Sequence, residues 1–148
     1  MGILMMIAFI LNIKNRGINL FNRDALHPTS CKAVLISVEK KLPKNWKAHC
    51  EKNTLKIEIQ TTLDSPNVDL LREALYLELG NNIVFLAKNT SPGTMDYVDL
   101  VEIYQINHRY DIRAYTKGKD ISKFSTMNDK KFILEHLKAT VTVRETKR

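Results

Sequence analysis

The sequence predicts an α+β fold in two layers, with an antiparallel sheet (a hairpin plus a meander) under one long helix and two shorter ones. Three patterns indicate it: a β-hairpin at Trp46–Gln60, a long apolar stripe at helical spacing after Pro66, and adjacent strand patterns from Tyr97 onward. Helices that are separate from runs of adjacent strands are typical of this class, and they pack on one face of the sheet. We find no strand–helix–strand alternation, so a parallel nucleotide-binding sheet is not expected.

Length and composition predict one globular domain. The chain has 148 residues, of which 44% are hydrophobic and 26% charged, with only five glycines and four prolines. Such a chain is long enough to bury a core and leaves little room for linkers. We expect residues 1–28 to form an apolar segment and connector, residues 29–143 the domain, and residues 144–148 a charged tail that frays.

The hairpin has the clearest local pattern. In WKAHCEKNTLKIEIQ, apolar and polar residues alternate on both sides of a polar turn. This alternation places one set of side chains in a core and the other in water. The expected inner set is Trp46, Ala48, Cys50, Leu55, Ile57 and Ile59.

Three helices are expected. The first runs from about Cys31 to Leu42 and ends before Pro43, although its β-branched residues also suit a strand. The second runs from Pro66 to Lys88, because its stripe of leucines continues past Gly80 to the stop signals that follow Lys88. Asn128 is expected to cap the third, short helix.

The second run of strands is expected after the long helix. Strand patterns cover Tyr97–Gln105 and Tyr110–Thr116, and a weaker one covers Ile121–Thr126 after a predicted turn at Lys117–Lys119. The β-branched stretch Ala139–Val143 is predicted to be a last strand.

The N-terminal stretch MGILMMIAFILNI leaves several interpretations open. Its apolar run of eleven residues is too short to span a bilayer, which takes about twenty residues, and it lacks the features of a signal peptide. It suits a buried strand or a start assigned too early, because Met5 and Met6 are alternatives. It also suits a membrane-surface anchor at residues 1–13, with Lys14 and Arg16 at the headgroups.

Cys31 and Cys50 are the only cysteines. They are consistent with two buried thiols in a reducing compartment or with one bridge in an oxidising compartment. Together with His27 and His49 they are the only clustered soft ligands. No zinc-type spacing is present, so no metal site is predicted.

No catalytic motif is evident. The chain lacks a nucleophile elbow and a phosphate-binding loop, so we expect neither catalytic residues nor a cofactor. Glu78 falls inside the apolar arc of the long helix, either as a buried carboxylate or as an edge residue that reaches water. The basic turn Lys117–Lys119 is too common to indicate a phosphate site.

The charge favours an acidic partner. The net charge is +7 and the isoelectric point is near 9.4, which suits nucleic acid, anionic lipid or an acidic protein. The basic residues are spread out, with modest clusters at Lys40–Lys47 and in the last five residues. The residues expected to face outward from the sheet and contact a partner are Lys47, His49, Lys56, Arg109, Arg113 and Tyr115.

These observations favour a non-enzymatic accessory or protein-interaction module in the cytoplasm. The alternative is sequence-tolerant nucleic-acid binding through a basic open sheet face. A third hypothesis is a membrane-surface accessory protein anchored by residues 1–13 and therefore membrane-associated.

Overall fold

The computed structural model describes residues 31–90 and 93–147. The expectations for the N-terminal segment, including the apolar run, lie outside this part of the chain. The elements in chain order are α2 (Cys31–Val38), η2 (Glu39–Lys41), β2 (Trp46–Glu51), β3 (Thr54–Gln60), α3 (Val68–Lys88), η3 (Met95–Tyr97), β4 (Leu100–Ile106), β5 (Tyr110–Thr116), α4 (Gly118–Ile121), η4 (Ser122–Thr126), α5 (Lys130–Thr140) and β6 (Thr142–Lys147).

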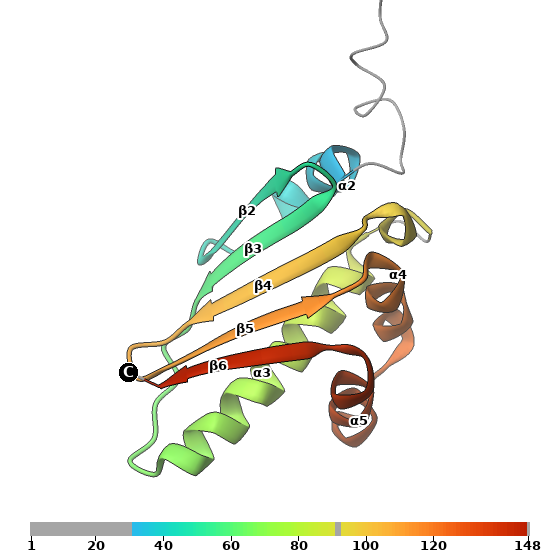
Figure 1. The fold of residues 1–148 in the computed structure, drawn as a ribbon. Coiled ribbons are helices and arrows are strands. Elements are labelled where there is room, and N and C mark those ends of the chain that lie inside the picture. Colours follow the sequence, from blue (N-terminus) through green and yellow to red (C-terminus); the bar gives the residue numbers. More distant parts are fainter. Residues whose placement is uncertain (1–30, 91–92, 148) are drawn as a thin grey trace, which may run out of the picture.

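The elements form two layers. The five strands make one mostly antiparallel sheet in the order β2-β3-β4-β5-β6, and α3 crosses behind it (Figure 1). The buried side chains of α2, α3 and α5 join one core with the inner side chains of the strands. The predicted α+β class is therefore confirmed. In the described part, no helix is both long and apolar enough to cross a bilayer.

One strand pair differs from the expected antiparallel sheet. β3 and β4 are parallel, whereas the other three pairs are antiparallel. The expectation of no strand–helix–strand unit was therefore wrong, because β3, α3 and β4 form one. The reason is the length of α3: its 21 residues span about 32 Å, enough to carry the chain back to the end of the sheet where β3 begins.

The hairpin prediction is confirmed, with Trp46 opposite Ile59 and Cys50 opposite Leu55. Trp46 and all three inner residues of β3 are buried, while Ala48 and Cys50 are partly buried. The Trp46 ring packs edge-on against Phe85 of α3, with the ring centroids 5.4 Å apart. The inner face of the hairpin therefore rests on the long helix.

The long helix passes through Gly80 without a break, as predicted, and begins at Val68. Asn67 caps it: its side-chain oxygen accepts hydrogen bonds from the backbone N–H groups of Asp69 and Leu70. Gly80 is buried, and a Cβ there would lie 2.6 Å from Cγ2 of Ile133. Glycine at this position therefore allows α5 to pack closely against α3.

Two expectations in the second half were wrong. Ile121–Thr126 is not a strand, because the chain leaves the sheet after Thr116 and forms α4 and η4. The backbone N–H of Gly118 donates to the carbonyl oxygen of Val98 over 3.1 Å, and a Cβ at Gly118 would collide with that carbonyl. At this close contact the chain leaves the strand direction and begins α4. The hairpin turn predicted at Lys117–Lys119 is therefore also absent.

The boundaries around the C-terminal strand also differ from those expected. Asp129 rather than Asn128 caps α5, and α5 continues through part of the stretch predicted to be a strand. β6 comprises Thr142–Lys147 and pairs with β5 from end to end. Residues 144–147, expected in a fraying tail, therefore form the edge of the sheet.

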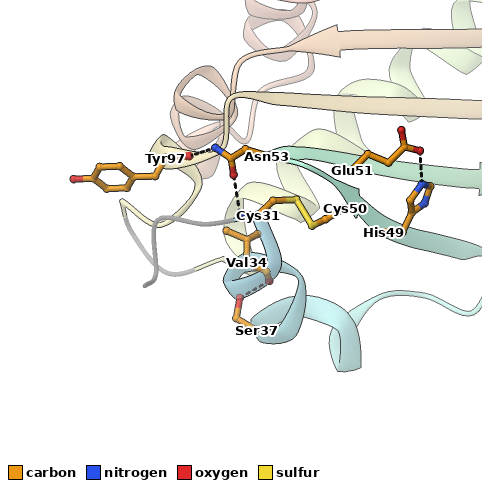
Figure 2. Close-up of a disulfide and its surroundings, with 8 residues drawn as sticks. All are labelled: Cys31, Val34, Ser37, His49, Cys50, Glu51, Asn53 and Tyr97. Carbon is orange, nitrogen blue, oxygen red and sulfur yellow. Dashed lines mark hydrogen bonds and ion pairs between the residues drawn. A yellow bond between two sulfur atoms is a disulfide. The ribbon is translucent and has the colours of Figure 1, made fainter. Parts of the chain in front are cut away.

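Cys31 and Cys50 form a disulfide, with their Cα atoms 6.1 Å apart (Figure 2). The backbone N–H of Cys31 donates to Oδ1 of Asn53 over 2.9 Å, and Nδ2 of Asn53 donates to the carbonyl oxygen of Tyr97 over 2.8 Å. The bridge and these two hydrogen bonds hold the start of α2 against the hairpin turn and η3.

Candidate functional site: the open face of the sheet

Within residues 31–90 and 93–147, the helices lie on one face of the sheet (Figure 1). We refer to the opposite side as the open face. The strand registers align its side chains in two central rows. One row consists of His49, Lys56, Glu102, Tyr115 and Thr142. The other consists of Lys47, Glu58, Tyr104, Arg113 and Arg144.

Five of the six predicted contact residues lie together on this face, namely Lys47, His49, Lys56, Arg113 and Tyr115. Arg109 does not join them. It lies in the turn between β4 and β5, where its Nη1 is 2.9 Å from Oδ1 of Asp64 and also donates to the carbonyl oxygen of Ser65. Because Arg109 precedes the first residue of β5, the alternation of that strand does not orient it, and it ties the turn to the loop before α3.

Glu102 is the centre of an ion-pair network on the open face. Its side chain is only 13% exposed; Oε2 lies 2.6 Å from Nη1 of Arg113, and Oε1 lies 3.9 Å from Nζ of Lys56. Lys56 also lies 3.0 Å from Glu51, whose other oxygen is 3.2 Å from Nε2 of His49 (Figure 2). Carboxylates and cations therefore alternate across four strands, from Glu51 of β2 to Arg113 of β5.

These contacts shift several pKa values on the open face. Hydrogen bonds from Lys56 and His49 lower the pKa of Glu51, and the bond to Glu51 raises the pKa of Lys56. The hydrogen bond to Glu102 raises the pKa of Arg113. All three shifts favour the charged forms of Glu51, Lys56 and Arg113.

Two arginines stack on tyrosine rings on this face. Cζ of Arg113 is 3.9 Å from the centroid of Tyr104, and Cζ of Arg144 is 5.6 Å from that of Tyr115. The hydroxyl of Tyr104 also donates to Oδ2 of Asp111 over 3.1 Å. The stacks present flat surfaces that are partly apolar and partly charged. Tyr104 and Arg144 were missing from the predicted set, although strict alternation from Glu102 would have identified Tyr104.

A hollow of about 290 Å³ lies between these side chains. Its volume is at the lower limit for a small-molecule site. The open face as a whole carries four cations, Lys47, Lys56, Arg113 and Arg144, and four carboxylates, Glu51, Glu58, Glu102 and Asp111. It is charge-balanced and not a continuous positive stripe.

On the helical side, Oε1 of Glu78 and Nε2 of His136 are buried without a hydrogen-bond partner, and they belong to different helices. The His136 ring packs against Phe124, with the centroids 4.7 Å apart. The described residues contain no group of three side chains that could hold a metal ion.

Comparisons with protein-family models, with curated proteins and with solved structures found no match to this chain.

Proposed function

We propose that this protein is a non-enzymatic interaction module that binds another protein through the open face of its sheet. The observation that carries the proposal is the pair of arginine–tyrosine stacks on an otherwise charge-balanced surface. Arginine and tyrosine are enriched among the residues that contribute most to protein–protein binding, since each offers apolar area together with directional polar groups.

The charge balance favours a protein over a nucleic acid as the ligand of this face. Affinity for a nucleic acid comes mainly from cations that neutralise successive phosphates. Here Arg113 is already ion-paired with the Glu102 carboxylate, and Lys56 is already ion-paired with Glu51, so neither cation is free to neutralise a phosphate. Protein surfaces carry both positive and negative charges. The open face, which also carries both, can therefore bind a protein surface of complementary pattern without leaving charges unmatched.

The disulfide bears on where this binding takes place. A bridge between Cys31 and Cys50 is stable in oxidising compartments and is reduced in the cytosol. The bridge therefore supports the second interpretation of the two cysteines and weighs against the cytoplasmic location expected from the sequence. Alkylation of the protein in intact cells, followed by mass spectrometry, would decide between a bridged pair and two free thiols.

A photo-crosslinking amino acid at position 115 tests the proposal, with the same amino acid at position 97 as its control. Tyr115 lies on the open face, whereas Tyr97 is 58% exposed in η3, outside the strands that form that face. We expect one discrete adduct from position 115 and none of that size from position 97. Equal adducts from both positions, or none from position 115, would contradict the proposal.

The captured partner is then purified and its affinity measured against two variants of β6. Arg144 faces outward and Lys147 faces the helical side of the same strand, so Arg144→Ala and Lys147→Ala form a matched pair. We expect Arg144→Ala to weaken binding by about 10-fold or more and Lys147→Ala to leave it unchanged. Equal effects of the two substitutions would show that the partner binds elsewhere.

A further inference from the structure

The positive charge of the described chain is concentrated in one segment. Residues 31–53 contain six lysines and two glutamates, whereas residues 54–147 contain thirteen basic and thirteen acidic residues. The excess charge of the described part therefore belongs to α2, η2, the loop after η2, the edge strand β2 and the turn after it. We call these six lysines the basic edge: Lys32, Lys40, Lys41, Lys44, Lys47 and Lys52.

The lysines of the basic edge are accessible. All six are exposed, and none of them forms an ion pair with another residue of the described chain. Of the two glutamates in the segment, Glu51 already contacts Lys56 and His49. The positive charge of the basic edge is therefore not neutralised by neighbouring side chains.

An exposed isoleucine lies among these lysines. Ile36 is 64% exposed and follows Lys32 by one turn on α2, and Lys40 comes four residues later in η2. The opposite side of the helix, with Cys31, Val34 and Val38, is buried. The disulfide to Cys50 fixes α2 against β2, so the lysines of the helix and of the strand are held in one rigid unit at this edge of the sheet.

We propose that the basic edge docks against an anionic phospholipid surface. Lysines attract anionic headgroups without requiring a fixed geometry, and an isolated Ile36 between them suits insertion at the level of the acyl chains. Recognition of a nucleic acid favours arginine and aromatic side chains, and the basic edge contains neither.

Lys47 belongs to both the open face and the basic edge. The other five lysines lie outside the two rows of the open face, so this proposal does not depend on the protein partner proposed above.

Co-sedimentation of the full-length protein with phosphatidylcholine vesicles, with and without phosphatidylglycerol, tests this proposal. The test variant Lys40→Gln/Lys41→Gln/Lys44→Gln leaves the open face intact. The control Lys130→Gln/Lys131→Gln/Lys138→Gln removes three exposed lysines from α5 and changes the net charge equally. Thermal unfolding of both variants checks that the fold is retained.

We expect the wild type to prefer the vesicles that contain phosphatidylglycerol. The test variant should bind these vesicles about 100-fold more weakly, at about fivefold for each lysine, while the control variant stays near the wild type. Ile36→Ser should also weaken vesicle binding with no change in net charge.

Four results would overturn the proposal. They are equal losses in the two triple variants, equal binding of the wild type to both kinds of vesicle, no vesicle binding at all, and loss of single-stranded RNA binding in the test variant without loss of vesicle binding. The last result would assign the basic edge to nucleic acid. Arg144→Ala should leave vesicle binding unchanged, which separates this test from that of the open face.

Discussion

Glu145 accepts hydrogen bonds from three side chains of two other elements. Nε and Nη2 of Arg72 donate to its carboxylate over 2.7 and 2.8 Å, and the hydroxyls of Tyr76 and Tyr110 donate to it as well. Burial and the bond to Glu145 raise the pKa of Tyr76 to about 12. This one carboxylate therefore fastens β6 to both α3 and β5.

Glu145 should make stability depend on pH in acid. The Arg72 guanidinium lowers the pKa of Glu145 from the ordinary value of 4.5. A carboxyl whose pKa is lower in the folded than in the unfolded chain stabilises the fold above that ordinary value, and the stabilisation is lost as the pH falls through the lowered value.

We expect Glu145→Gln to cost about 1–3 kcal/mol of unfolding free energy at pH 7, because bonds to a charged acceptor contribute that much. Urea unfolding at a series of pH values should show the difference between wild type and variant shrinking below pH 4.5. Glu135→Gln, at an exposed position of α5, is the control and should lie near the wild type throughout. A difference that grew in acid would refute this role of Glu145.

At the scale of elements, the contact between α3 and α5 depends on the absence of a side chain at position 80. A Cβ there would lie 2.6 Å from Cγ2 of Ile133, a branched methyl that cannot swing aside as the end of a long side chain could. The α3–α5 contact therefore leaves no room for even one methyl group.

Overpacking in Gly80→Ala should cost about 1–3 kcal/mol. The higher helix propensity of alanine offsets about 1 kcal/mol of this, so we expect a net destabilisation of up to about 2 kcal/mol. Chemical denaturation measures the change. Because the two residues share one contact, adding Ile133→Ala should relieve part of the cost, so that the double variant is more stable than additivity predicts. A stabilising Gly80→Ala, or full additivity, would show that the helices are not in close contact there.

Elements with local patterns could be predicted from the sequence, while those set by distant contacts could not. The hairpin and the long helix have their own periodicity, which is why Trp46 and the α3 leucines were placed correctly. Thr142–Lys147 has no apolar alternation in its sequence. Its pairing with β5 makes it a strand, and a pairing between distant segments cannot be read from a local pattern. Nothing in the sequence around Gly118 indicates that its backbone N–H bonds to the carbonyl oxygen of Val98. Most open-face residues could be predicted from the alternation within each strand. The balance of charge on that face could not, because it depends on which residues the strand registers place side by side.

For the whole molecule, the disulfide has a testable effect on stability. It joins residues 19 apart in the sequence, and closing a loop of that size stabilises a fold by about 3 kcal/mol, chiefly by restricting the unfolded chain. We expect a reducing agent to lower the melting temperature of the wild type and not that of a Cys31→Ser/Cys50→Ser variant. Hydrogen exchange should quicken in α2 on reduction and remain slow in β4 and β5, and a uniform change would contradict this local effect.

The parallel pairing of β3 with β4 also bears on the order in which the chain folds. The hairpin partners Glu51 and Thr54 are neighbours in sequence, whereas Thr54 and Leu100 meet only after the whole of α3 has been placed between them. Hairpins close within microseconds, and contacts between distant residues come later because they carry a larger loop entropy. We therefore expect the antiparallel pairs on the two sides of the sheet to form early, and the parallel pairing of β3 with β4 to be the slow step of folding.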